Sequence, residues 1–263
     1  MSDTDTLVFI AHDESIGTIT MNDARRRNAL SEELIEGVVN AIRQLEHAKA
    51  RAIVLRAARG ARTWSSGHDV RELPTNGRDP LAYNDPLRLL VRRIQMCPSP
   101  VVAMVEGGVW GGACEVVMSC DFVVASESTT FAITPARMGV PYNVGGTLNL
   151  MRSANISLVK EMLFCAKSVD AVRAHLVGLV NYVVPQDELE EQTYGLAREI
   201  VQNSPMVIAL LKEELRVLSA ASPLTPETFE RIQGLRRAIY DSQDYQEGIR
   251  AFFEKREPRF EGK

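Results

Sequence analysis

A repeated alternation of apolar strands and amphipathic helices is the feature that most constrains the fold of this chain. Residues 7–22 have the pattern of two short strands around a polar turn, and residues 28–48 have that of an amphipathic helix. An apolar strand is expected at 51–57, and another at 99–107 runs into a glycine-opened helix at 111–120. The recurring order of strand, loop and helix, without a strict sequence repeat, favours an α/β architecture.

The same order occurs once more before the pattern changes. Residues 121–134 are expected to form two strands, and residues 143–152 a helix. Beyond them the pattern is helical almost end to end, with one short strand at 179–184. We therefore divide the chain into an α/β core over residues 1–200, which holds the candidate site, and a helical region over residues 201–263.

Two loops interrupt the predicted core. Residues 58–67, "ARGARTWSSG", are expected to be irregular and to bound the strand at 51–57. Residues 77–80, "GRDP", are the most linker-like segment of the chain. Because this segment is brief, we expect it to be a surface loop near the candidate site.

The charge balance limits the classes of partner. The net charge is −4 and the sequence pI is about 5.7, so no broad basic surface attracts nucleic acid or an anionic membrane. No apolar run approaches the ~18 residues that a membrane span needs. The first residues, "MSDTDTLVF", have neither a basic start nor a hydrophobic signal core. The sequence therefore predicts a cytoplasmic protein that binds neither nucleic acid nor a membrane.

The cysteines and histidines favour neither a disulfide framework nor a metal site. No two cysteines have the C-x-x-C spacing, and each lies in an apolar or helical context, so we expect reduced core residues. The histidines are too scattered to suggest a ligand cluster, and no metal is expected. These residues are Cys97, Cys114, Cys120 and Cys165, and His12, His47, His68 and His175.

The segment "WSSGHDV", residues 64–70, is the first candidate site. Gly67 allows the backbone to approach a ligand closely, and Asp69 can cap the helical turn that follows. Backbone N–H groups would then point outward, as they do at helix N-termini that bind anions. The alternative is a plain turn between a strand and a helix, with His68 in solvent.

The segment "EGGVWGGACE", residues 106–115, is the second candidate. Gly111 and Gly112 open a helix directly after a buried strand, so the Gly112 N–H has no helical acceptor. Glu115 follows three residues later and projects from the same face. A donor for a developing oxyanion beside a carboxylate is a catalytic arrangement. The alternative is a glycine-rich helix start that allows close packing, with Glu115 in a structural ion pair.

Five segments, in this order, resemble the enoyl-CoA hydratase/isomerase, or crotonase, family over essentially the whole chain. The resemblance implies a spiral of ββα units, a C-terminal helical trimerisation region, and a homotrimer or a hexamer built as a dimer of trimers. It also implies acyl-CoA thioester substrates, and no separate cofactor is expected because CoA enters as part of the substrate. The segments are "RRRNALS", "WSSGHDV", "VVAMVEGGVWGGACEVVMSCDFVVAS", "FAITPARMGVPYNVGGT" and "DYQEGIRAFFEKREPRF".

The same resemblance implies the site residues. The two backbone N–H groups of the family's oxyanion hole map to His68 and Gly112. Phe252 and Lys255, on the C-terminal helix of a neighbouring subunit, are expected to close over the nucleotide, with Lys255 facing a phosphate. The alternative for Lys255 is a solvated helix end. The residues expected along CoA and the acyl group are Arg26, Ala29, Ser66, Gly67, His68, Asp69, Val70, Gly112 and Thr134.

Longer stretches, such as "TPARMGVPYNVGG", resemble the family members that decarboxylate methylmalonyl-CoA rather than the hydratases. Hydratases use two glutamates, of which one matches Glu115. The position of the other holds Pro135, which has no proton to move. The resemblance places an orienting tyrosine at Tyr142. It implies loss of CO2 from methylmalonyl-CoA to give propionyl-CoA, through an enolate that the two backbone donors stabilise.

Tyr142 has a defined task in this chemistry. The C–C bond breaks readily when the carboxylate is perpendicular to the thioester plane, and a neutral phenol can hold it there. A cation would stabilise the ground-state carboxylate instead. The alternative is that Tyr142 packs on the loop with its hydroxyl in water. The proton that quenches the enolate could come from His68 or from ordered water, and the role of Glu115 is left open.

Two other functions fit the same residues. A hydratase or double-bond isomerase would work through Glu115 alone, and it would consume the conjugated thioester of crotonyl-CoA. A non-catalytic acyl-CoA-binding subunit would keep the fold and bind CoA tightly, without turnover of any malonyl-type thioester.

Overall fold

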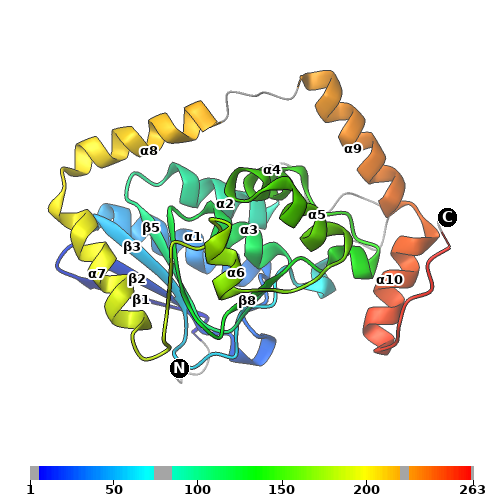
Figure 1. The fold of residues 1–263 in the computed structure, drawn as a ribbon, viewed down its shortest axis with the longest axis horizontal. Helices are drawn as coiled ribbons and strands as arrows, with labels where there is room; N and C mark the ends of the chain where they lie inside the picture. The colour runs from blue at the N-terminus through cyan, green and yellow to red at the C-terminus, as the bar shows by residue number, and fades with distance from the viewer. Residues whose placement is uncertain (1–5, 74–84, 220–224, 262–263) are drawn as a thin grey trace.

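A six-stranded sheet lies at the centre of the computed structural model, which describes residues 6–73, 85–219 and 225–261 (Figure 1). Its strand order is β1-β2-β3-β5-β7-β10, with β1 antiparallel to β2 and the other neighbours parallel. The predicted loop at residues 77–80 lies outside the described residues. The strands are β1 (Val8–Asp13), β2 (Ile16–Met21), β3 (Ala52–Ala57), β5 (Val101–Val105), β7 (Phe122–Ser126) and β10 (Tyr182–Val184).

A second sheet in the described part of the chain contains short strands in the order β4-β6-β8-β9. Successive segments of the chain contribute a strand to the first sheet, a short strand to the second, and then a helix. This is the spiral of ββα units that the resemblance implies. The elements are β4 (Thr63–Ser65) before α2 (Pro86–Met96), β6 (Gly108–Trp110) before α3 (Gly112–Ser119), and β8 (Thr130–Ala132) before α4 (Val144–Ser153), with β9 (Val169–Asp170) at the edge.

Side chains that alternate along the central strands form two cores on opposite faces of the first sheet. On β3, Ile53 and Leu55 join the core that includes the apolar face of α1 (Glu32–His47). Val54 belongs to the other core, beneath α7 (Leu189–Gln202). Successive residues of a strand point to opposite faces, and both faces of this sheet are covered, so β3 is apolar at almost every position.

The short strands of the second sheet correct two expectations. Residues 58–67 are expected to be irregular, but Thr63–Ser65 forms β4 and pairs with β6. The strand at 99–107 is expected to run directly into a helix, but β6 separates it from α3. A strand of three residues is too short to show a hydrophobic period, so the sequence pattern does not reveal it.

The expectation that all four cysteines belong to the core is wrong for one of them. Cys97 and Cys114 are buried and Cys120 is half-buried, but Cys165 is exposed, and all four are free thiols. Cys165 ends the surface helix α5 (Ile156–Phe164), so its apolar neighbours along the chain do not bring it into the core.

The C-terminal helices α8 (Pro205–Ser219) and α9 (Pro226–Tyr240) lie apart from the two sheets in Figure 1, whereas α10 (Gln243–Glu254) packs on the short helix η3 (Pro135–Met138). Every residue of α8 is described, and none is fully buried. Lys212 joins α8 to the core, because its ammonium group donates to Asp121 Oδ2 at 2.7 Å. Among the described residues, no helix is both long enough and apolar enough to pass through a membrane.

Candidate active site

The structure brings the two glycine-bearing segments, residues 64–70 and 106–115, against each other. Gly67 has a φ of +83°, and a Cβ at this position would lie 2.4 Å from the Trp110 carbonyl oxygen. The same Cβ would lie 3.0 Å from the Gly112 nitrogen. Both the positive φ and the close approach require a residue without a side chain. Gly67 therefore sets how closely the two segments lie.

The backbone N–H groups of His68 and Gly112 are neighbours at this contact. A Cβ built on Gly112 would lie 3.5 Å from the His68 nitrogen. Gly112 begins α3, where the first N–H groups have no helical acceptor, and neither N–H group donates a hydrogen bond to another described residue. Two adjacent donors of this kind can stabilise an oxyanion that develops between them.

Two segments expected along CoA also lie side by side. The Leu30 N–H donates to the Gly67 carbonyl at 2.8 Å, and the Ser66 N–H donates to the Arg27 carbonyl at 3.0 Å. These bonds place the segment that contains Arg26 and Ala29 next to the one that runs from Ser66 to Val70. A cavity of about 420 Å³ lies beside them, and its lining includes Arg27, Asn28 and Arg62.

Two of the side chains in these segments have partners of their own. Arg26 pairs with Asp23 at 2.5 Å, and Asp69 accepts the Arg71 backbone N–H at 3.1 Å and pairs with its guanidinium group. The Arg71 hydrogen bonds hold the pKa of the Asp69 carboxyl below its usual value. Asp69 caps the short helix η2 (Val70–Glu72), as the sequence predicts.

The side chain of His68 lies near the start of α2. A Cβ on Gly112 would lie 3.9 Å from the His68 Cβ and 2.9 Å from a methyl group of Leu87, in the first turn of α2. Asp85 caps this turn by accepting the Leu87 N–H at 2.9 Å. Burial raises the pKa of the Asp85 carboxyl, and the nearby His68 opposes the rise. His68 Nδ1 is buried without a hydrogen-bond partner in the described residues, unlike the solvated histidine of the alternative.

Glu115 projects from the first turn of α3 into a buried contact with the loop before α4. It is 3% exposed, and its Oε2 accepts a hydrogen bond from Asn143 Nδ2 at 2.5 Å. Asn143 also caps α4, because its Oδ1 accepts the Gly146 N–H at 2.7 Å. Asn143 is not among the site residues predicted from the sequence. The position of Asn143 before a helix predicts that it caps the helix. Its hydrogen bond to Glu115 joins residues 28 positions apart, so no local sequence pattern reveals it.

Tyr142 lies against Glu115. A Cβ at Gly146 would be 2.8 Å from Tyr142 Cε1 and 3.0 Å from Glu115 Oε2, so the ring and the carboxylate meet beside this glycine. Tyr142 is half-buried and packs against the main core. Burial, reinforced by the charge of Glu115, raises the pKa of the Tyr142 phenol well above its usual value. The hydroxyl therefore stays protonated and can donate a hydrogen bond.

Tyr142 also lines a cavity of about 850 Å³ with mostly apolar walls. The loop before α4 forms one side of it, and Phe164, Ile239 and Phe260 belong to the other lining residues. Thr134 precedes the short helix η3 (Pro135–Met138), next to residues that line this cavity. Its contact with the acyl group stays a prediction.

Phe252 and Lys255 lie at the surface, on α10 and at its end. Phe252 is 48% exposed, and Lys255 ends the helix with a φ of +54°. α10 packs on η3 of the same chain so closely that a Cβ at Gly248 would lie 1.9 Å from the Met138 carbonyl oxygen. That these two residues cover the nucleotide of a neighbouring subunit stays a prediction.

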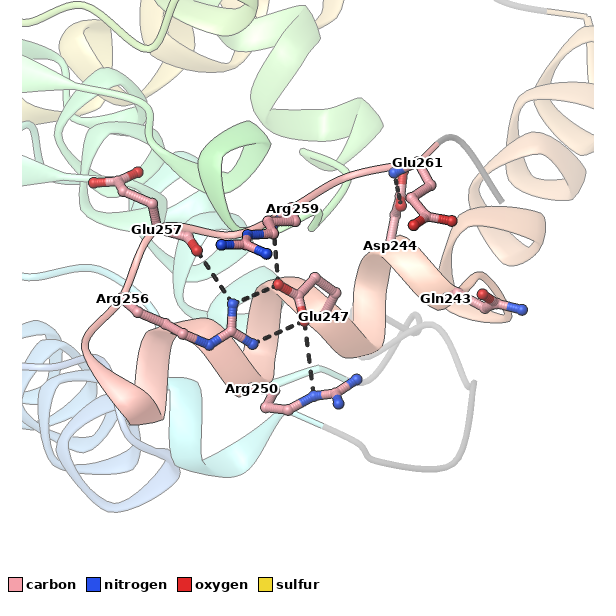
Figure 2. A pocket seen from close by; sticks show the side chains of 8 residues that line it. All are labelled: Gln243, Asp244, Glu247, Arg250, Arg256, Glu257, Arg259 and Glu261. Atoms are coloured by element: carbon pink, nitrogen blue, oxygen red, sulfur yellow. Dashed lines mark hydrogen bonds and ion pairs between the residues drawn. The ribbon is translucent and has the colours of Figure 1, made fainter.

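A charged cavity of about 720 Å³ lies between α10 and the C-terminal tail (Figure 2). Glu247 accepts hydrogen bonds from Arg256 Nη1 at 2.6 Å and from the Arg259 N–H at 2.9 Å. These bonds, that of Arg256 above all, lower the pKa of Glu247 to about 2. Arg250 also pairs with Glu247, and Arg256 with Glu254, so we interpret the cluster as a fastening for the tail rather than as an anion site.

The chain matches the model of the enoyl-CoA hydratase/isomerase family over residues 11–263. It is 49% identical over 247 residues to methylmalonyl-CoA decarboxylase of Escherichia coli (strain K12), and the match covers 94% of this chain and 95% of that protein. It is 31% identical to a probable mitochondrial enoyl-CoA hydratase of Dictyostelium discoideum, over 94% of this chain and 88% of that one.

A solved structure confirms the predicted fold. The crystal structure of methylmalonyl-CoA decarboxylase complexed with 2S-carboxypropyl-CoA is similar to this one with a TM-score of 0.96 and 47% sequence identity, and the match covers 100% of both chains. The α/β spiral of ββα units is therefore the crotonase fold. With a family model that spans almost its whole length, the chain belongs to the enoyl-CoA hydratase/isomerase family.

Proposed function

We propose that this protein is a carboxy-lyase that converts methylmalonyl-CoA to propionyl-CoA and CO2. One observation carries the proposal: the protonated phenol of Tyr142 lies against the first turn of α3, the helix that begins with one of the two adjacent backbone donors. The 49% identity to a methylmalonyl-CoA decarboxylase supports the same reaction.

The two donors would stabilise the intermediate. When the carboxylate leaves as CO2, the electron pair of the broken C–C bond moves into the thioester carbonyl and forms an enolate. The N–H groups of His68 and Gly112 would bind the enolate oxygen, and a well-aimed donor lowers the barrier by about 3 kcal/mol. A proton from His68 or from ordered water would then add to the enolate carbon and give propionyl-CoA. This route needs no nucleophile, and CoA takes part only as a portion of the substrate.

Tyr142 would orient the group that leaves. Its hydroxyl would hold the substrate carboxylate perpendicular to the thioester plane, where the breaking bond overlaps with the carbonyl. Because the phenol is neutral, it stabilises the ground-state carboxylate less than a cation would. Pro135 supports decarboxylation over hydration, since it occupies the position where a hydratase has its second glutamate.

CoA would lie along the two paired segments, and Thr134 would contact the acyl group. Arg27 and Arg62 in the adjoining cavity support this placement, because guanidinium groups bind phosphate through paired hydrogen bonds. The residues proposed along CoA are Arg26, Ala29, Ser66, Gly67, His68, Asp69 and Val70.

We also propose that residues 201–263 form an oligomerisation region and that the protein is a homotrimer or a dimer of trimers. The apolar side chains that α8 exposes support an assembly in which another subunit covers them. Phe252 and Lys255 would then close over a neighbour's nucleotide. Light scattering over a range of concentrations tests the mass, and a monomer throughout would contradict the assembly. The exposed residues of α8 are Met206, Val207, Leu210, Leu211, Leu215, Val217 and Leu218.

Release of CO2 from methylmalonyl-CoA tests the reaction. The wild type is expected to release CO2 and to form propionyl-CoA. Tyr142→Phe keeps the ring but loses the hydroxyl, so kcat is expected to fall about 100-fold, as for the loss of one oriented donor. Equal rates would remove Tyr142 from the mechanism, and no release by either protein would remove the reaction.

Crotonyl-CoA provides the control for the competing function. A hydratase or isomerase that works through Glu115 would consume the conjugated thioester, and its absorbance would decline as enzyme is added. We expect no such decline. Consumption of crotonyl-CoA without CO2 release from methylmalonyl-CoA would favour the hydratase instead.

A further inference from the structure

Asn143 uses both ends of its side-chain amide in buried hydrogen bonds. The oxygen accepts the Gly146 N–H at 2.7 Å and so caps α4, while the nitrogen donates to Glu115 Oε2 at 2.5 Å. Asn143 is 4% exposed and Glu115 is 3% exposed. One side chain therefore connects the start of α4 with the first turn of α3, the helix that provides the Gly112 donor.

The carboxylate oxygen that Asn143 holds and the ring of Tyr142 both lie next to Gly146. A Cβ at Gly146 would be 3.0 Å from Glu115 Oε2 and 2.8 Å from the Tyr142 ring. A side chain at residue 146 would collide with both groups, so this glycine leaves the space in which they meet. The position of the Glu115 carboxylate and that of the ring are therefore linked.

Because Asn143 is the donor in its hydrogen bond to Glu115, the bond favours the ionised form of the Glu115 carboxyl group. An amide N–H that donates to a carboxylate stabilises the ionised form of that group. An ionised Glu115 opposes a second negative charge at its neighbour, and it contributes to the raised pKa of the Tyr142 phenol. A protonated phenol is the form that can donate to a substrate carboxylate.

We propose that Asn143 is a positioning residue that fixes the Glu115 carboxylate beside Tyr142 and thereby holds the phenol in the orientation that the substrate carboxylate requires. The inference rests on the proposed function and gives Glu115 a task in a site where proline replaces its catalytic partner. Glu115 transfers no proton in this account. It holds in place the phenol that orients the leaving carboxylate.

The first test separates this task from helix capping. Asn143→Asp retains the cap, since aspartate is as good an N-cap as asparagine, but it replaces the donor to Glu115 with a second carboxylate. Asn155→Asp is the matched control, because Asn155 caps α5 by accepting the Leu158 N–H at 3.0 Å. We expect kcat for CO2 release to fall roughly 10- to 100-fold in Asn143→Asp, as when an orienting group is misplaced, and to stay unchanged in the control.

The pH profile and the Michaelis constant add two readouts that a cap does not affect. Two carboxylates in contact share a proton, so kcat of Asn143→Asp should gain a new ionisation at mildly acid to neutral pH, with higher activity on the acid side. KM for the thioester should change little, because the segments proposed to bind CoA lie elsewhere. Should Asn143→Asp fail to fold, Asn143→Ser also supplies a cap without the amide donor, and the same loss of kcat is expected.

A double-mutant cycle with Glu115→Gln gives the decisive comparison. If Asn143 acts through Glu115, adding Asn143→Asp to Glu115→Gln should lower kcat by less than about twofold, because the linked interaction is already lost. Equal losses in both backgrounds would show that Asn143 acts only through the structure of α4, and the inference would be wrong.

The titration of Tyr142 provides a readout without catalysis. NMR spectra of protein labelled in the ring carbons of its six tyrosines, with Tyr142→Phe for assignment, follow the phenol directly. Tyr142 should ionise at lower pH in Glu115→Gln than in the wild type, and an unchanged titration would contradict the inference. If the wild type releases no CO2, the proposed function fails; if it does and Asn143→Asp equals Asn155→Asp, only the inference fails.

Discussion

The helices α3 and α8 differ in where their apolar residues find partners. Except for Met118, α3 buries every one of its residues between the sheets and α4, and its first turn contributes to the candidate site. α8 buries none of its residues fully, although it contains two adjacent leucines and several other long apolar side chains. The geometry of α3 is therefore determined within one chain, whereas α8 presents a surface that a second chain could cover.

The two regions are also held by different interactions. Around α3, backbones approach so closely that glycines at 67, 112 and 146 have no room for a Cβ without displacing a neighbour. On α8 and at the C-terminal tail, charged groups make the specific connections, such as Lys212 with Asp121 and Glu247 with Arg256. Steric changes should therefore affect the first region most, and changes of charge the second.

Gly67→Ala should have the largest effect. The new Cβ would overlap the Trp110 carbonyl oxygen and displace the His68 N–H from the oxyanion, so kcat/KM is expected to fall at least 100-fold. Gly178→Ala is the matched control, since Gly178 has a φ of +86° and its Cβ would meet only the Ser153 carbonyl oxygen, at an ordinary 3.6 Å. Both variants carry the backbone strain of about 1–2 kcal/mol, but only Gly67→Ala should lose activity in the CO2-release assay.

Equal activity of Gly178→Ala and Gly67→Ala would break the comparison at the contact between Gly67 and Trp110. It would mean that the approach of the two glycine-bearing segments is not required for the reaction. Thermal unfolding of both variants shows whether their strain is matched.

Lys212→Met should have an intermediate effect, on stability rather than on the reaction. Removing the ammonium group leaves the Asp121 carboxylate, whose side chain is 24% exposed, without its charged partner, so the free energy of unfolding should fall by about 1–2 kcal/mol at neutral pH. Lys160→Met, at an exposed position, is the control. Denaturant unfolding followed by circular dichroism measures both.

The pH dependence of this loss has a definite sign. Burial raises the pKa of Asp121 above its usual 3.8, and loss of Lys212 should raise it further. The folded variant then binds a proton more tightly than the unfolded chain, so the destabilisation appears as pH rises above 3.8 and is complete above the folded-state pKa. If the difference in unfolding free energy between Lys212→Met and the wild type stayed constant down to acid pH, the ionised Asp121 carboxylate would not be its cause.

Glu247→Gln should have the smallest effect, confined to the C-terminal tail. Amide exchange at Arg259 should become faster, because its N–H donates to Glu247 at 2.9 Å, while CO2 release should stay unchanged. In the wild type, the lowered pKa of Glu247 means that its stabilising effect is present above pH 4.5 and is lost as pH falls through about 2. Glu230→Gln removes an exposed ion pair with Arg237 and is the control. Equal amide exchange at Arg259 in both variants would contradict the role of Glu247 in fastening the C-terminal tail.

Features with a local signal could be predicted from the sequence. Ser31 precedes an apolar stripe and caps α1 by accepting the Leu34 N–H at 3.3 Å, as predicted. The polar turn between β1 and β2 was equally visible, because alternating apolar residues flank it. The family motifs extended this to the order of ββα units, which the structural comparison confirms. The assignment of roles to site residues, and of residues 201–263 to an oligomer, stays a prediction.

Features that depend on contacts between distant segments could not be predicted in the same way. β4 and β6 exist because they pair with each other, and three residues carry no period of their own. The bond between Asn143 and Glu115 depends on the packing of α3 against α4, which no spacing in the sequence encodes. A chemical role for a single residue is therefore easier to propose from the sequence than the identity of the distant residue that holds its side chain in place.

The contact between α10 and η3 has a consequence for how this chain can be altered. Two backbones meet there without an intervening side chain, because Gly248 faces the Met138 carbonyl and Gly139 faces that of Asp244. A C-terminal helix transplanted from another family member would dock only if it carried a glycine at the matching place. In any chimera, α10 and the loop that leads to Tyr142 must therefore be exchanged together, from the same parent protein.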